Sequence, residues 1–352
     1  MPEPTETRYA YGEALLELGS QRPEVVVLDA DLYKSTCTVL FRDAFPERFI
    51  DVGISEADMV STAAGMAATG LIPYCNSFAI FITSICYLPI RTQIAYPSLP
   101  VKLAGSSAGL TQGPDGASHQ SLEDIALMRI LPNMAVVSPA DDVETRQATF
   151  AIADWPGPVY MRLGRYPVPR LFDKGHRFEI GKATTVRDGG DVAIFATGHT
   201  VCKALDAAEL LARDRIESRV VNVSTIKPLD EAAVRQVAGE VGLLVSVEEH
   251  SVIGGLGGAV AECVSGIANT PPLLRLGVHD KFGESGLADE LLEKHRLTGR
   301  LIADDIRRAL SGHEHHHRSR KISTQLCSQR TLVRCSNGDD RTENCEIRTQ
   351  CQ

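Results

Sequence analysis

The sequence predicts an α/β protein made of two consecutive α/β domains, each with a mainly parallel sheet flanked by helices. Short apolar runs rich in β-branched residues alternate with segments of helical periodicity. A stretch rich in Pro and Gly separates two such series. Apolar strands that alternate with helices favour a parallel sheet covered on both faces. We therefore predict a first domain at 1–165, a linker at 166–190 and a second domain at 191–311.

The first domain is predicted to alternate helices and strands from its start. Its expected helices cover Thr7 to Leu18, Ser55 to about Thr69, Phe78 to Tyr96, Leu122 to Leu131 and Val143 to Ala153. Its expected strands cover Val25 to Leu28, Phe49 to Val52, Leu71 to Asn76, Pro100 to Gly105, Met134 to Val137 and Pro158 to Leu163. Ser55 with Asp58 three residues later predicts a capping box at the second helix.

The second domain repeats the alternation after the linker, where Pro167, Pro169 and the Gly189-Gly190 pair break the pattern. Its expected strands cover Val192 to Ala196, Ser218 to Val223, Leu243 to Val247 and Leu273 to Leu276. Its expected helices cover Val201 to Ala212, Glu231 to Ala238, Gly257 to Ile267 and Ala288 to Lys294, and the domain closes with Gly299 to Leu310.

Residues 312–352 differ in composition from the rest of the chain. A histidine cluster is followed by polar residues with few apolar ones, which cannot bury enough surface to fold. A histidine cluster is also compatible with metal binding, but we favour a disordered tail derived from an expression tag or a vector.

The overall composition narrows the class of protein. The chain has 352 residues and a formal net charge of −9, which argues against a nucleic-acid partner because such a partner requires a basic stripe. No apolar run is long enough for a membrane span, and the start of the chain lacks the features of a signal peptide. We expect a cytoplasmic protein that meets small anionic substrates through local arginines.

Two glycine motifs suggest chemistry that the surrounding sequence does not support. Gly105 to Gly109 matches the G-x-S-x-G elbow of serine hydrolases, but a long polar loop follows it instead of a helix. Gly254 to Gly258 precedes a helix, yet it lacks both the dinucleotide spacing and the P-loop lysine. We expect tight packing at the second motif.

Five side chains follow successive predicted strands. Glu56 lies just after one strand, Phe78 and Phe81 follow the next on one helix face, and Asp115 and His119 lie in the loop after a third. Because the carboxyl ends of parallel strands meet at one edge of an open α/β sheet, these side chains are expected to share a crevice. Taken singly, Glu56 also fits a helix start and the phenylalanines fit a core.

Residues 7–310 resemble the C-terminal half of transketolase, which comprises a thiamine diphosphate pyrimidine-binding domain and a small C-terminal domain. Five segments carry the resemblance by their order and spacing. They are Gly53-Ile54-Ser55-Glu56, Ser77-Phe78-Ala79-Ile80-Phe81, the loop Leu110 to Gln120, Leu131-Pro132-Asn133-Met134, and Val247-Glu248-Glu249-His250 with the glycines after it.

The resemblance implies that this chain binds part of thiamine diphosphate and uses it in catalysis. Glu56 would hydrogen-bond the aminopyrimidine N1′ nitrogen and favour the imino tautomer that takes the proton from the thiazolium C2. Phe78 and Phe81 would line the pyrimidine pocket, with Phe81 stacking on the ring, and Asp31 would approach the thiazolium side.

The resemblance also implies a sugar phosphate substrate. His119, with a catalytic role, and Asp115 match residues that contact the sugar near its carbonyl and hydroxyl groups. Arg8, Ser35 and Arg165 match positions that hold the phosphate of the acceptor.

Two departures from the family pattern define the expected partner and substrate. The folded part lacks the family's GDG motif, so diphosphate and Mg²⁺ would be bound mainly by an N-terminal transketolase subunit, in an α2β2 assembly inactive without it. Ser107 stands where the family has a His that contacts substrate. The alternatives are a 1-deoxyxylulose 5-phosphate synthase-like enzyme, a 2-oxoacid dehydrogenase E1 β-like subunit, and a non-catalytic assembly or regulatory subunit.

Overall fold

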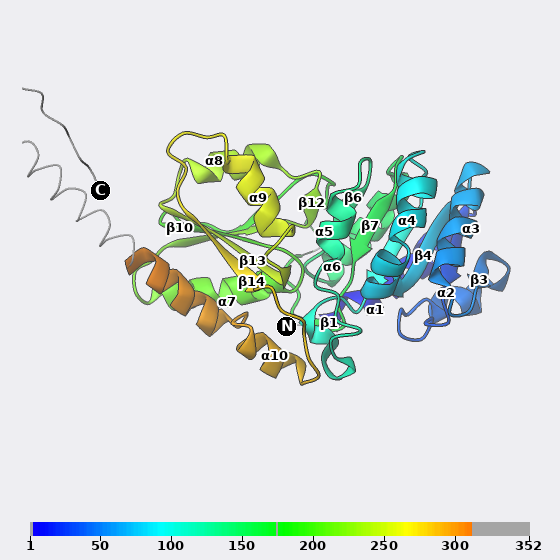
Figure 1. The fold of residues 1–352 in the computed structure, drawn as a ribbon, viewed down its shortest axis with the longest axis horizontal. Helices are drawn as coiled ribbons and strands as arrows, with labels where there is room; N and C mark the ends of the chain where they lie inside the picture. The colour runs from blue at the N-terminus through cyan, green and yellow to red at the C-terminus, as the bar shows by residue number, and fades with distance from the viewer. Residues whose placement is uncertain (1–2, 174, 312–352) are drawn as a thin grey trace, which may run out of the picture. The chain divides into compact units, whose positions relative to one another are not determined.

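Two mainly parallel β-sheets, each flanked by helices, form the body of the protein (Figure 1). The computed structural model describes residues 3–173 and 175–311. The predicted fold class, two consecutive α/β domains, is confirmed. The tail predicted at 312–352 lies outside the described residues. Within the described ranges, none of the helices is long and apolar enough to cross a membrane.

The first sheet has seven strands in the order β12-β6-β7-β5-β4-β2-β3. Their bounds are β2 Val25–Asp29, β3 Phe49–Asp51, β4 Ile72–Phe78, β5 Lys102–Ser106, β6 Ala135–Val137, β7 Val159–Arg162 and β12 Thr225–Lys227. All neighbouring pairs are parallel except β12 with β6. The carboxyl ends of β2 to β5 and β7 therefore lie along one edge.

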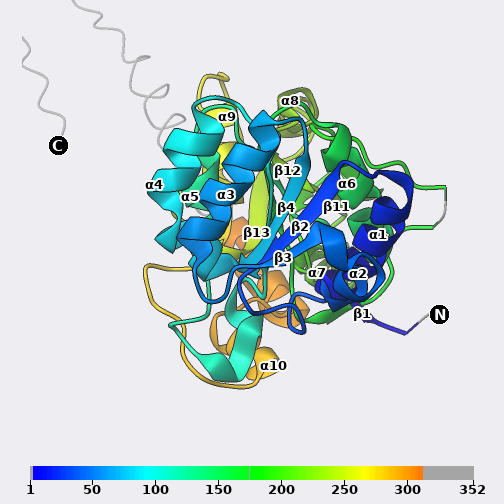
Figure 2. The ribbon, with the colours of Figure 1, turned by 90° about the vertical axis from the view of Figure 1, so that its right-hand side faces the viewer.

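Helices cover both faces of this sheet because successive strand residues point to opposite sides. Val25 and Val27 pack with α1 (Thr7–Gln21), α2 (Val39–Ala44) and α6 (Asp142–Asp154). Val26 and Leu28 pack with α3 (Glu56–Ala68) and α5 (Asp124–Arg129) on the other face. Figure 2 shows the two groups of helices on opposite sides of β4 and β2.

The second sheet has five strands in the order β14-β13-β10-β11-β9, parallel except for β9. The strand bounds are β9 Thr184–Arg187, β10 Val192–Ala196, β11 Ser218–Asn222, β13 Leu243–Ser251 and β14 Leu273–Val278. The helices are α7 Thr200–Ala212, α8 Glu231–Ala238, α9 Leu256–Val264, α10 Ala288–Lys294 and a final helix at 299–311.

The two sheets are joined by more than a connecting segment. Strand β12 follows β11 of the second domain in the chain, but it pairs with β6 of the first sheet, where Thr225 lies opposite Val137. One apolar cluster runs from Val26 and Met59 through to Phe195 and Leu244 of the second sheet. The segment predicted as a linker contributes β8 (Pro167–Val168), which pairs with β1 (Thr5–Glu6), and the edge strand β9. The domain boundaries themselves stay a prediction.

The structure corrects the helix predicted from Phe78 to Tyr96. Phe78 is the last residue of β4 and pairs with Ser106 of β5, so the strand runs further than its apolar pattern suggests. Three short helical segments follow in order: the π-helix η2 (Phe81–Ile85), the α-helix α4 (Tyr87–Pro89) and the π-helix η3 (Ile90–Ala95). Proline lacks the N–H of the regular helical ladder, which fits the interruption at this point.

The predicted capping box is wrong as well. The Ser55 side chain forms no capping hydrogen bond at the start of α3. The turn before the helix is held instead by Asp51, whose Oδ1 accepts from Gly53 N at 2.9 Å and from Asp31 N at 3.1 Å.

Candidate functional site

Glu56 begins helix α3 with a buried side chain that is only 6% exposed. Ser77 Oγ, in β4, donates to Glu56 Oε1 at 3.0 Å. Among the described residues no other hydrogen bond or ion pair of this side chain forms, so Oε2 is left for a further donor. The positive end of α3 stabilises a carboxylate at this position. After burial, the charge of Glu56 also contributes to raising the pKa of Cys86 to about 12.

Three rings gather next to Ser77. The Phe78 and Phe81 rings are stacked with centroids 6.0 Å apart, although Phe78 lies on a strand and Phe81 begins a helix. The prediction that Phe78 and Phe81 share one helix face is therefore wrong, although the two rings do lie close together. His119 approaches both rings edge-on, at 5.2 Å from Phe81 and 6.1 Å from Phe78. The cluster offers an aromatic wall with one polar edge.

His119 and Asp115 come from the loop after β5, which contains the short helix η4 (Leu110–Asp115). His119 Nδ1 lies 3.0 Å from Ser118 Oγ. The Gln112 side chain donates to Asp115, and Arg165 lies 3.8 Å from the same carboxylate. Asp115 and Arg165 therefore face each other across the loop, both with partly exposed side chains.

Arg8 and Ser35 lie together at the same edge. Arg8 Nη1 donates to the Ser35 carbonyl oxygen at 2.8 Å, and Arg8 Nε pairs with Glu6 at 2.6 Å. The Arg8 backbone N donates to Gly164 O at 3.3 Å, which places Arg8 beside the residue that precedes Arg165. The backbones of Arg8 and the segment that carries Arg165 are therefore in contact, while the two side chains pair with Glu6 and Asp115 respectively.

Asp31 belongs to the same edge by way of Asp51. Asp31 follows β2 and Asp51 ends β3, and the Asp51 carboxylate bridges Asp31 N to Gly53 N in the turn before Glu56. Asp31 itself is exposed and adopts φ +59°, a left-handed conformation that Asp tolerates better than most residues. The predicted site residues thus fall into local groups at this edge of the sheet, namely Glu56 with Ser77, the Phe78, Phe81 and His119 rings, Asp115 with Arg165, and Arg8 with the Ser35 backbone.

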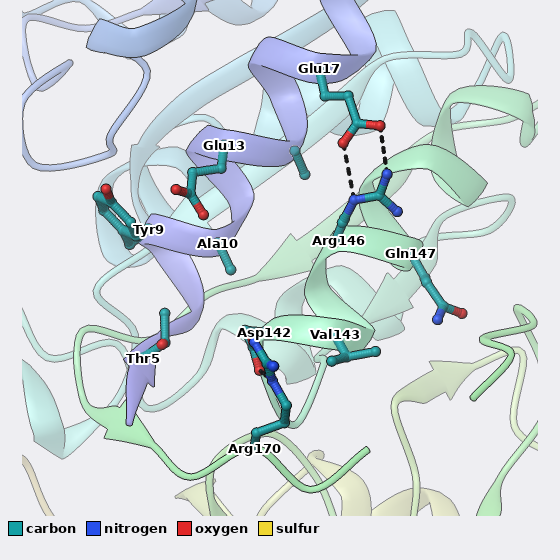
Figure 3. A pocket seen from close by; sticks show the side chains of 11 residues that line it. Thr5, Tyr9, Ala10, Glu13, Glu17, Asp142, Val143, Arg146, Gln147 and Arg170 are labelled. Carbon is teal, nitrogen blue, oxygen red and sulfur yellow. Dashed lines mark hydrogen bonds and ion pairs between the residues drawn. The ribbon is translucent and has the colours of Figure 1, made fainter. Parts of the chain in front are cut away.

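Figure 3 shows a different pocket, of about 650 Å³, between α1 and α6. Both arginines that line it are ion-paired, Arg146 with Glu17 at 2.5 Å and Arg170 with Asp142. It contains none of the predicted site residues. Within the described ranges no three His, Cys, Asp or Glu side chains are grouped to hold a metal ion.

The two motifs set aside in the sequence behave as expected. Ser107, of the apparent hydrolase elbow, is fully buried with its hydroxyl 3.4 Å from Ser106 Oγ, which is no position for a nucleophile. Gly255 packs so closely that a Cβ there would lie 1.9 Å from Glu248 Oε2. Glu248 accepts from Leu256 N and Gly257 N at 2.7 and 2.8 Å, so a buried carboxylate caps α9.

A buried polar network under the loop was not predicted as functional. Arg162 Nε, at the end of β7, donates to Asp124 at 2.7 Å, and its Nη2 donates to Glu249 O at 2.8 Å. Burial raises the pKa of Asp124, but the charges of Arg162 and His250 and the hydrogen bonds from Arg162 and Tyr160 together hold that pKa below its usual value. His199 Nδ1 lies 3.0 Å from Glu249 Oε2. In the sequence, only the family-like segment Glu248-Glu249-His250 pointed to this network.

The architecture and the site define a class of protein, namely paired α/β units whose strand ends bring together a buried carboxylate and an aromatic wall. Residues 3–169 match the family model "Transketolase, pyrimidine binding domain", and residues 181–302 match "Transketolase, C-terminal domain". The chain belongs to the transketolase family.

Individual relatives agree with this assignment. The putative transketolase C-terminal section of Methanocaldococcus jannaschii is 45% identical over 301 residues, which cover 85% of this chain and 94% of that protein. The 6-deoxy-6-sulfo-D-fructose transketolase subunit SqwH of Clostridium sp. is 45% identical over 84% of this chain and 91% of its own. The 1-deoxy-D-xylulose-5-phosphate synthase of Dictyoglomus thermophilum is 34% identical, and this chain spans about half (49%) of it.

A solved structure gives the same result. The structure titled "Split gene transketolase, inactive beta4 tetramer" superposes with a TM-score of 0.81 at 47% identity, covering 87% of this chain and 98% of the other.

Proposed function

We propose that this chain is the C-terminal subunit of a split transketolase and transfers a two-carbon ketol unit between sugar phosphates together with a partner subunit. The observation that carries the proposal is that one sheet edge brings together the buried Glu56 bonded to Ser77, the Phe78, Phe81 and His119 ring cluster, and the Asp115–Arg165 pair. The similarity to proteins named as transketolase sections or subunits supports it.

The residues at Glu56 fit an aminopyrimidine. The mostly buried carboxylate uses only Oε1, toward Ser77, so Oε2 can accept from a ligand that donates to it. Phe78 and Phe81 offer the apolar wall for an aromatic ring. Thiamine diphosphate, when bound, supplies the carbon nucleophile of ketol transfer. Glu56 would hold a proton shared with the ring nitrogen, Phe78 and Phe81 would orient the ring, and Asp31 would approach the cofactor from its own loop.

The remaining site residues suit a sugar phosphate. His119 and Asp115 present a ring nitrogen and a carboxylate to substrate carbonyl and hydroxyl groups. Arg8 and Arg165, with Ser35, supply the positive charge and donors that a phosphate needs. Because Arg8 already pairs with Glu6, a phosphate must compete with that carboxylate, and binding should weaken as salt rises.

The partner is proposed to be an N-terminal transketolase subunit that binds the diphosphate through Mg²⁺, in an α2β2 assembly. The similar structure whose title describes an inactive β4 tetramer supports inactivity without such a partner. The cytoplasmic location stays a prediction.

The test is reconstitution with the partner, thiamine diphosphate and Mg²⁺, followed by an assay of ketol transfer from xylulose 5-phosphate. We expect Glu56→Gln to lower kcat by about 10²- to 10⁴-fold, the usual contribution of an acid–base group. Glu13→Gln is the matched control, since Glu13 is an exposed carboxylate on α1 in the pocket of Figure 3. Near-normal turnover in Glu56→Gln, or full activity of this chain alone, contradicts the proposal.

A second candidate is a 1-deoxyxylulose 5-phosphate synthase-like reaction, which the 34% identity to such a synthase favours. The same reconstituted assembly distinguishes the two. Release of CO₂ from pyruvate without ketol transfer from xylulose 5-phosphate would select the second candidate.

A further inference from the structure

The loop that carries Asp115 and His119 is held at its start by a side chain from the second sheet. The Thr111 backbone N donates to Glu249 Oε1, of β13, across 138 residues of sequence. Gly109, at φ +83°, lies directly against the same carboxylate, and a Cβ there would stand 2.3 Å from Glu249 Cδ. The glycine therefore lets the loop backbone reach the carboxylate.

Glu249 is itself fixed from several sides. The residue is 2% exposed, its Oε2 lies 3.0 Å from His199 Nδ1, and its carbonyl oxygen accepts from Arg162 Nη2 at 2.8 Å. Arg162 is anchored in turn on Asp124 at 2.7 Å. A buried carboxylate held in this way has little freedom to move, so it can serve as a fixed reference for the loop.

The far end of the loop is held by the segment before α10. Gln120 Nε2 donates to Glu284 O at 2.9 Å and to Gly113 O at 3.1 Å. At Gly283 a Cβ would meet Gln120 Oε1 at 1.8 Å, so the two segments are in close contact. Helix η4 also packs against α10 (Figure 2).

We propose that Glu249 is a positioning residue for the reaction. By fixing Thr111 and Gly109 it sets the path of loop 109–120, which keeps His119 against Phe81 and Asp115 facing Arg165. This inference rests on the proposed function, because that function assigns His119 and Asp115 to the substrate. It gives the second sheet a part in the reaction although that sheet contributes none of the substrate contacts.

The experiment compares Glu249→Ala with Glu249→Gln in the full chain. Glutamine keeps an acceptor for Thr111 N and a group within reach of His199, whereas alanine removes both. Hydrogen exchange of the peptide spanning residues 107–121 measures loop fixation, and kcat and KM for the sugar phosphate are measured with the partner. The matched control is Arg129→Ala. Arg129, in α5, contacts Glu262 of α9 and the Gly254 carbonyl oxygen, so this variant also removes a contact between the two domains, but one that lies outside the loop.

We expect Glu249→Ala to speed exchange at Thr111 and to lower kcat/KM by about 10- to 100-fold, in line with the cost of small misplacements of reacting groups. Much of that loss should appear as a raised KM. Glu249→Gln should stay within about threefold of the unchanged protein, because it restores the acceptor. If Glu249→Ala does not fold, Glu249→Asp, which withdraws the carboxylate by one methylene, should show the faster exchange instead.

Exchange and kinetics in Glu249→Ala equal to those of Arg129→Ala would overturn the proposal. So would a Glu249→Gln variant as impaired as Glu249→Ala. Hydrogen exchange needs neither partner nor substrate. If the unchanged assembly shows no ketol transfer, the proposed function fails while the exchange result still decides whether Glu249 fixes the loop.

Discussion

Asp29 ends strand β2 with a fully buried carboxylate. Its Oδ1 accepts from Leu32 N at 2.6 Å, and its Oδ2 accepts from Thr36 Oγ1 at 2.8 Å and Thr38 Oγ1 at 2.9 Å. Burial nevertheless raises the pKa of Asp29 from 3.8 to about 6, since the hydrogen bonds offset desolvation only in part.

The raised pKa makes stability depend on pH. Between pH 3.8 and about 6 the folded protein binds the proton that the unfolded chain has already lost, so the free energy of unfolding falls as pH rises through this window. A shift of roughly two pKa units corresponds to about 3 kcal/mol. The destabilisation is fully present above about pH 6, the pKa of Asp29 in the folded protein, and absent below pH 3.8, its pKa in the unfolded chain.

Asp29→Asn removes the titration and keeps the shape. The Thr36 hydroxyl has Leu32 O as a second acceptor at 3.2 Å, so it can turn and accept from the new amide. We expect the free energy of unfolding of the variant, relative to that of the unchanged protein, to rise by about 2.4 kcal/mol between pH 4 and 7.5. Urea denaturation followed by circular dichroism at several pH values measures this.

Asp31→Asn is the control, because Asp31 is exposed and asparagine tolerates its positive φ. Its effect should stay within about 0.5 kcal/mol at every pH. A difference between Asp29→Asn and the unchanged protein that does not vary from pH 4 to 7.5 would refute the reasoning.

Two further predictions concern buried groups. Burial lowers the pKa of Lys102 to about 7 from 10.5, so the unfolded chain binds more protons between these values and the free energy of unfolding should rise with pH, by up to about 1.4 kcal/mol per unit. Lys102→Met should flatten that rise in urea titrations from pH 7 to 9.5, and an unchanged slope would contradict it. Gly255→Ala places a methyl group 1.9 Å from Glu248 Oε2 and should destabilise by about 1–3 kcal/mol. Gly258→Ala in α9, with no atom within 4 Å of its Cβ, should stabilise by about 0.4–1 kcal/mol, and calorimetry showing equal effects would exclude the steric explanation.

Local patterns predicted most of the helices and strands. Helix α8 begins and ends at the predicted residues because Asp230 caps it, with its side chain accepting from Ala233 N, and because Val234 and Val237 repeat at helical spacing on its buried side. The boundary at Phe78 was missed since the strand continues only by pairing with Ser106, a partner that β4's own pattern does not reveal.

The candidate site was predictable as far as it depends on strand ends. Glu56 and His119 follow parallel strands and Phe78 ends one, so the topology brings all three to one edge. The attachment of Thr111 to Glu249 was not predictable, because the two residues are 138 positions apart and neither belongs to a motif that requires the other.

Strand β12 has a consequence for any attempt to divide this polypeptide. A fragment that stops before Thr225 would leave β6 as an edge, with the unpaired backbone groups of Val136 and Val137 open to a neighbouring copy. Such a fragment should self-associate through that edge even though its own helices remain complete. A fragment that contains only the first domain should stay monomeric only if residues 225–227 are fused to it through a short linker, so that they can pair with β6.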